Sequence, residues 1–297
     1  VFSMYNFYRS RDVIVRIAKT LESQFGHLPH VNPYSSNFAV LAVGANIEGT
    51  PFDIPDPKII EDLPSDDWPF LYLTHKHIPF LYIIPLLIMI LLSAFTIVFL
   101  APKEATTGTT YRLPFFLMGA AFLLLETKSI IQFSLLFGST WVVNSLVFAG
   151  VLVMVLLANQ LVSWRKPRHI WVWYALLFVS LVIGWAIQVQ DLVTIESAVL
   201  RYLAAVSILF TPIFFANVIF AGTFVDSEAS EVSFGWNLFG TMFGGGLEYL
   251  SLATGYRALA VLVAVLYVGA LIAFMLKRGT KSTPTTATRG PTSDESE

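Results

Sequence analysis

Long apolar runs separated by short polar segments dominate the chain from Ile78 onward. Each run is close to the length of about 20 residues that an α-helix needs to cross the hydrocarbon core of a bilayer. The pattern predicts a mainly α-helical, polytopic membrane bundle of six to seven helices over residues 79–276. The individual spans are predicted at 79–100, 113–137, 141–162, 170–189, 199–223, 233–254 and 257–276.

Residues 1–45 have a different pattern, which is typical of a soluble α/β unit. The stretch "VFSMYN" alternates as a strand does, and "FAVLAVG" indicates a buried strand. Between them, Ser10 and Gly26 mark the start and stop of a helix. Its apolar positions share one face: Val13, Ile14, Ile17, Leu21 and Phe25. The order strand, helix, strand predicts the C-terminal remnant of a larger sheet, too small to be stable by itself.

Residues 46–78 form an acidic, proline-rich linker followed by an interfacial segment. Residues 46–69 contain five prolines and seven acidic residues against one lysine, a composition that cannot build a core and predicts an extended hinge. Aromatic rings such as that of Trp68 favour the membrane interface. At the other end, residues 277–297 are polar and low in complexity, and we expect a disordered tail.

The amino-acid composition limits the classes of function that are possible for this chain. Charged residues make up 13% of the chain, against about 25% in soluble domains, so the bilayer is the expected surrounding. The net charge of −2 gives no indication of a nucleic-acid partner. The chain has no cysteine, which excludes disulfides and thiolate chemistry. His75 and His77 have no third ligand near them in sequence, so no metal site is predicted.

Glu126, Lys128 and Glu248 are the informative charged residues, because they lie away from the ends of the predicted spans. Each costs about 2.5–3.5 kcal/mol in a bilayer. Glu126 and Lys128 are two positions apart and point away from each other on a helix, so each needs a partner on another helix. Lys128 shares a helical face with Gln132. Three interpretations of these charges are open. They form a buried ion pair that fixes helix packing, they belong to a substrate or proton site, or the segment is short enough to leave them near the interface.

The span at 233–254 carries polar and small residues on one helical face: Asn237, Thr241, Gly244 and Glu248. Gly240 and Gly244 form a pair of small residues at the spacing that permits close helix approach. The run 244–246 is glycine throughout and is able to break a helix. The two interpretations are tight packing and a cavity lined by Asn237 and Glu248.

Several sequence segments resemble parts of one protein family. "VFSMYNFYRSRDVIVRIAKTLESQFG" resembles the late strand and following helix of the spermidine-synthase-like, S-adenosylmethionine-type domain. "SDDWPFLYL" is similar to the segment that joins this domain to membrane helices in the bacterial membrane-bound members. "FFLMGAAFLLLETKSI" and "SEVSFGWNLFGTMFGGGLEYLSLATGYRAL" are similar to their membrane part. The resemblance covers most of residues 1–276.

The resemblance implies a parent protein that transfers an aminopropyl or methyl group from S-adenosylmethionine or its decarboxylated form, in the bacterial inner membrane. The family's glycine-rich cofactor loop and catalytic Asp do not occur here, so the catalytic residues stay unknown. We therefore expect a C-terminal part whose partner is the upstream catalytic half, before Val1. Alone, it is expected to bind no cofactor and to be inactive.

Asp66 and Asp67 have two interpretations. They are helix caps or solvated charges, or they line a candidate active-site mouth that attracts a polyamine cation. For the membrane domain, the alternatives to the transferase are a transporter-like bundle with a polar site and a passive anchor.

Orientation leaves a conflict. Basic residues cluster at 165–168 and 277–281, which the positive-inside rule places in the cytoplasm. A cytoplasmic α/β unit followed by three full spans would place the first cluster outside. The conflict disappears if one early segment does not cross fully, and 113–137 is the expected segment because it carries two charges.

Overall fold

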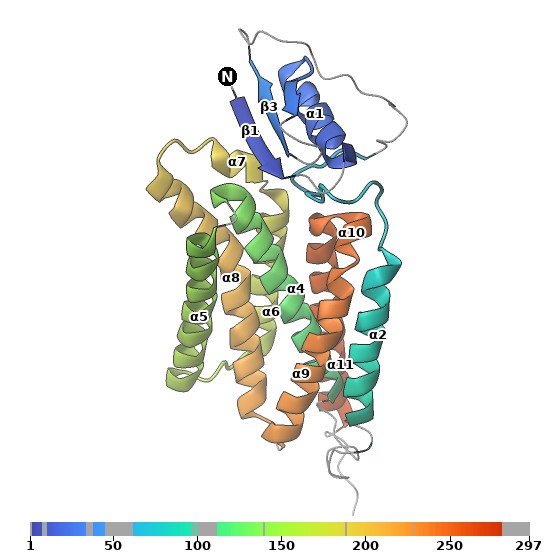
Figure 1. Ribbon diagram of the computed structural model, residues 1–297. Helices are drawn as coiled ribbons and strands as arrows, with labels where there is room; N and C mark the ends of the chain where they lie inside the picture. Colours follow the sequence, from blue (N-terminus) through green and yellow to red (C-terminus); the bar gives the residue numbers. More distant parts are fainter. Residues whose placement is uncertain are drawn as a thin grey trace, which may run out of the picture.

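The computed structural model describes residues 2–7, 11–33, 38–44, 62–96, 99, 112–138, 140–187, 189–227 and 229–280. Within these ranges, a bundle of helices carries a small α/β unit at one end (Figure 1). Residues 46–61 of the expected hinge and residues 281–297 of the expected tail lie outside the described residues.

The α/β unit contains a three-stranded sheet and one helix. Its elements are β1 (Phe2–Phe7), α1 (Arg11–Phe25), β2 (His30–Pro33) and β3 (Phe38–Val43). The strand order is β1-β3-β2, and β3 pairs antiparallel with both neighbours. Hence β1 and β2 run parallel to each other and are connected through α1. The sequence pattern predicted β1, α1 and β3 but not β2, whose four residues are too few to show a period.

The expected apolar face of α1 packs on β3. Val13, Ile14, Ile17 and Leu21 are buried with Leu41 and other residues of β3. Phe25, also predicted on this face, is 46% exposed because it lies at the last turn of the helix. Gly26 then ends the helix with φ of 79°, a conformation that glycine adopts without strain.

The bundle follows the apolar runs closely. Its helices are α2 (Phe80–Phe95), α4 (Arg112–Phe137), α5 (Trp141–Trp164), α6 (Ile170–Ala186), α7 (Val189–Val193), α8 (Ala198–Val225), α9 (Ser230–Glu248), α10 (Ser251–Thr254) and α11 (Tyr256–Thr280). Four helices in the described part of the chain are long and apolar enough to cross a membrane: α4, α5, α8 and α11. The chain is therefore a multi-pass membrane protein.

α4 is the central helix. It packs against α9, α11, α8 and α5 and buries residues along its whole length. With 26 residues it is long enough to cross, so the segment 113–137 is not the short one that we expected. The shorter apolar helices are α2, with 16 residues, and α6, with 17. α2 lies at the edge of the bundle beside α9 and has no buried residue (Figure 1).

Two helix ends differ from expectation. α9 continues through the glycine run at 244–246 and ends at Glu248, so these glycines do not break it. α11 continues to Thr280, four residues beyond the predicted end at 276.

Candidate functional site at the junction of sheet and helices

The acidic stretch "SDDW" folds into a tight turn at the junction. Ser65 and Trp68 exchange two backbone hydrogen bonds of 3.2 and 3.0 Å, and the Ser65 hydroxyl accepts a further bond of 3.2 Å from the Trp68 amide. The turn directs the indole into the protein, where it is 1% exposed. This end of the expected hinge is therefore docked and not extended.

Trp68 connects the α/β unit to the helices. Its Nε1 donates a 2.7 Å hydrogen bond to the carbonyl oxygen of Leu252 in α10. On the other side, the guanidinium of Arg16 from α1 lies 5.4 Å from the ring centre, a cation–π distance. Trp68 was expected at the lipid interface; it is instead buried between two parts of the protein.

Arg16 and Asp62 hold the segment against α1. Arg16 is 1% exposed, and its Nη2 donates a 2.6 Å hydrogen bond to the carbonyl oxygen of Asp62. Burial lowers the pKa of Arg16, and the nearby Asp62 carboxylate opposes this shift. The carboxylate also accepts a 3.1 Å bond from the Lys76 amide, so the ends of segment 62–76 are drawn together.

Asp67 caps α11, although the helix begins 189 positions later in the chain. Its Oδ1 accepts a 2.7 Å hydrogen bond from the Arg257 amide, and its backbone oxygen accepts a 2.8 Å bond from the Tyr256 amide. These are free amides of a helix start, which side-chain oxygens satisfy well. Of the two interpretations of Asp67, the geometry matches the cap. Asp66 is exposed in the same turn.

A cavity of about 350 Å³ opens below the turn. Its walls come from the junction segment, the start of α2, and the region where α9, α10 and α11 meet. The lining residues are Pro69, Phe70, Leu71, Tyr72, Leu73, Tyr82, Glu248, Tyr249, Ser251, Leu252 and Tyr256. A volume in the range of ligand sites, with few polar groups among aromatic rings, is typical of a binding cavity.

Glu248 is the charged residue among the described lining of this cavity. Its Oε2 accepts a 3.3 Å hydrogen bond from the Thr127 hydroxyl of α4. The Tyr256 hydroxyl bonds to the Ser251 side chain and lies within electrostatic reach of Glu248. The sequence pointed to Glu248 but not to Tyr256, Ser251 or Thr127, because ordinary polar residues at helix ends carry no signal of their own.

Lys128 does not join the two glutamates. It is 6% exposed in α4, and its Nζ donates a 2.6 Å hydrogen bond to the Gln132 side-chain oxygen one turn later. Within the described residues, no ion pair connects it to Glu126 or Glu248. Glu126 is half-buried on another side of the same helix. An ion pair among these three residues, one of the interpretations of the sequence, is thus absent from the described residues. Lys128 and Gln132 share a helical face as expected.

Asn237 and the neighbouring glycines belong to a tight contact between α9 and α4. Asn237 Nδ2 donates a 3.2 Å bond to the Phe115 carbonyl oxygen. A Cβ at Gly240 would clash with the Phe116 carbonyl, and one at Gly244 would lie 2.6 Å from that of Ala120. Backbones approach this closely only where side chains are missing. Gly240 and Gly244 therefore serve tight packing between the two helices, which was one of the two interpretations of this face. Asn237 also borders a small cavity of about 120 Å³.

Within the described ranges, the side chains do not form a candidate site for a metal ion or a nucleotide cofactor. No group of three or more His, Asp or Glu side chains converges there. The glycine run at 244–246 does not form a phosphate-binding turn, because it lies inside α9 against α4 and α2.

A scan against protein-family models, a search of curated proteins and a search of solved structures each found no significant match to this chain. The class that fold and site define is a multi-pass membrane protein with an α/β unit docked on its bundle.

Proposed function

We propose that this chain is the membrane portion of a bacterial inner-membrane, spermidine-synthase-like protein, whose parent transfers an aminopropyl or methyl group from an S-adenosylmethionine-type donor. The observation that carries the proposal is the docking of a strand–helix–strand unit on the bundle through Trp68, Asp67 and Arg16. These residues lie in the sequence segments that resemble the spermidine-synthase-like family.

The α/β unit supports the proposal through its topology. β1 and β2 run in the same direction and are joined by α1, while β3 lies between them and is antiparallel to both. Their outer edges offer unpaired backbone groups with which further strands can pair. The unit buries one face of one helix on three strands, which is a small core. An upstream catalytic half that continues this sheet would supply both the missing strands and the cofactor site.

In this proposal the chain positions the catalytic half and does not perform chemistry itself. Asp67 and Trp68 fix the segment after the sheet to α10 and α11, so the sheet is held at the membrane surface in one orientation. The junction cavity then lies directly below the α/β unit.

Calorimetry tests the proposal. The protein from the full open reading frame and the chain 1–297 are purified in the same detergent and titrated with S-adenosylmethionine and its decarboxylated form. We expect micromolar binding of one donor by the full protein and none by the chain. Binding by the chain alone, or by neither protein, would contradict the proposal.

A transporter-like membrane domain is the second candidate. The cavity at Glu248 favours it, because it places a carboxylate in an open cavity at the end of the bundle. Uptake of solute into vesicles that contain the chain alone distinguishes the transporter from the membrane portion of a transferase. Uptake that is lost in Glu248→Gln would favour the transporter.

A further inference from the structure

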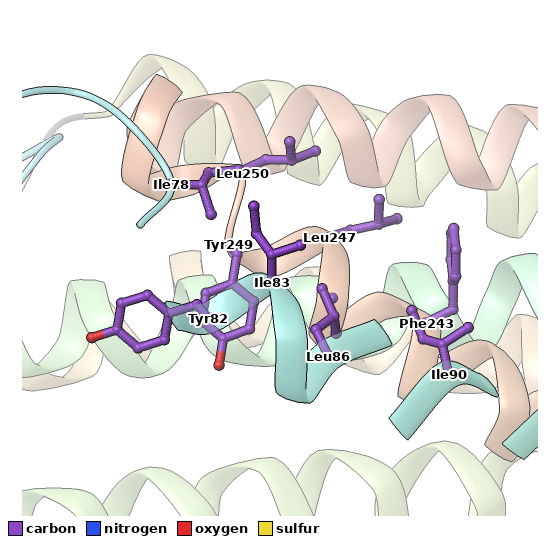
Figure 2. Close-up of a pocket in the computed structure, with 10 residues that line it drawn as sticks. Ile78, Tyr82, Ile83, Leu86, Ile90, Phe243, Leu247, Tyr249 and Leu250 are labelled. Atoms are coloured by element: carbon purple, nitrogen blue, oxygen red, sulfur yellow. The ribbon is translucent and has the colours of Figure 1, made fainter. Parts of the chain in front are cut away.

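An apolar groove runs along the outside of the bundle between α2 and α9. It has a volume of about 220 Å³ and is lined by Ile78, Tyr82, Ile83, Leu86, Ile90, Phe243, Gly246, Leu247, Tyr249 and Leu250. Figure 2 shows these side chains along the groove, with Tyr82 and Tyr249 at one end and Phe243 and Ile90 at the other. The tyrosine hydroxyls are the polar side-chain groups in this lining.

The groove adjoins the cavity below the turn at Ser65–Trp68, which we call the junction cavity. Tyr82 and Tyr249 line both spaces, and their rings stack with centres 5.3 Å apart. On one side of this pair lie aliphatic side chains at the depth of the membrane helices. On the other side lie Glu248, Ser251 and Tyr256 below the α/β unit. The two adjoining spaces thus differ in character: the groove is apolar, and the junction cavity is acidic and aromatic.

The geometry points to a binding site for a single-chain amphiphile with a cationic amine head. The apolar groove accepts the alkyl tail, because a bilayer offers lipid tails and no water at this surface. Glu248 supplies the negative charge for the head, and no basic side chain lines the cavity in the described part of the chain.

Aromatic rings complete the head site. Tyrosine faces attract ammonium groups within about 6 Å of the ring centre, and Tyr72, Tyr82, Tyr249 and Tyr256 surround the cavity. Basic side chains of the adjoining elements contact other groups: the guanidinium of Arg257 lies 4.8 Å from the Trp185 ring, and Lys128 bonds to Gln132. Lys76 lies 5.9 Å from the centre of the Trp68 ring and 4.0 Å from the Asp62 carboxylate. An anionic head would thus meet Glu248 with no compensating charge. This inference does not depend on the transferase chemistry of the parent.

Photolabelling tests the site. The chain in lipid nanodiscs is labelled with a diazirine-bearing long-chain amine, and the labelled peptides are mapped. We expect label on α2 and α9 around Leu247 and Phe243, displaced by tetradecylamine at concentrations at least about ten-fold lower than by tetradecanoate. Equal displacement by both, or label spread evenly over the lipid-facing helices, would overturn the inference.

Substitutions distinguish the binding of the alkyl tail from the binding of the amine head group. Leu86→Trp fills the groove and should reduce labelling about ten-fold, while Leu87→Trp, on the neighbouring lipid-facing position, should not. Glu248→Gln should keep the label in the groove but remove the preference for tetradecylamine over tetradecanol. Unchanged labelling in Leu86→Trp, or an unchanged preference in Glu248→Gln, would contradict the assignment. Where a variant does not fold, the competition on the unsubstituted chain still decides.

Discussion

The indole Nε1 of Trp68 lies 2.7 Å from the carbonyl oxygen of Leu252, and this hydrogen bond joins residues 184 positions apart. Trp68 belongs to the segment that leaves the α/β unit, and Leu252 belongs to the short helix between α9 and α11. The bond therefore fixes the sheet to the end of the bundle. It also explains why an acidic aromatic turn precedes the first apolar helix: the turn is a docking element.

Replacing Trp68 with Phe should loosen this docking. The change removes the hydrogen bond and leaves the buried Leu252 carbonyl unpaired, which costs about 1–3 kcal/mol. We expect a lower Tm in detergent and faster hydrogen exchange in α1. Trp164→Phe, at a position 77% exposed, is the matched control and should change neither. Equal exchange in α1 for both variants would argue against docking through Trp68.

Asp67→Ala should weaken the start of α11. Loss of a side-chain cap costs about 1 kcal/mol, and the amide of Arg257 loses its acceptor. Asp67→Asn keeps an oxygen acceptor and should retain most of the stability. Thermal unfolding of the three proteins checks this order. If Asn and Ala were equally destabilising, the negative charge and not the cap would be the relevant property.

Gly240→Ala should strongly destabilise the contact between α9 and α4. The new methyl group would meet the Phe116 carbonyl on the facing backbone, and overpacking of this kind costs about 1–3 kcal/mol or more. Gly235→Ala in the same helix has open space around its Cβ and should be neutral or gain up to about 1 kcal/mol from helix propensity. Comparison of the two Tm values is the test, and similar losses would contradict the packing.

Lys128 should couple to Gln132 and not to Glu248. In a double-mutant cycle with Lys128→Met and Gln132→Leu, we expect a coupling energy above about 0.5 kcal/mol, because each single change leaves the other partner of a part-buried hydrogen bond unpaired. The cycle of Lys128→Met with Glu248→Gln should be additive within about 0.5 kcal/mol. The reverse pattern in thermal unfolding would restore the ion pair that the sequence suggested.

The sequence predicted those features that local patterns determine. The run at 141–162 corresponds to α5 at Trp141–Trp164, and α1 ends where Gly26 was expected to stop it. The spacing of Gly240 and Gly244 indicated a close helix contact, and α4 provides the facing backbone. Apolar length, glycine spacing and helix stops act within one element, so they are visible without the fold.

Contacts between distant segments were not visible in the sequence. A Trp beside an apolar run is typical of a lipid interface, so nothing local distinguished Trp68 from an anchor. A cap is normally sought next to its own helix, whereas Asp67 caps a helix that begins after the rest of the bundle. For Lys128, the partner on its own helix was sufficient, because the Gln132 oxygen satisfies the ammonium.

Transfer activity in membranes is the decisive measurement for the proposed transferase function of the full protein. Membranes containing the product of the full open reading frame, or the chain 1–297, are incubated with radiolabelled S-adenosylmethionine or its decarboxylated form and a set of amine acceptors. The account predicts labelled product with the full protein, none with the chain, and a reduced rate in full protein carrying Trp68→Ala. Transfer by the chain alone, or no transfer from either donor by the full protein, would contradict it.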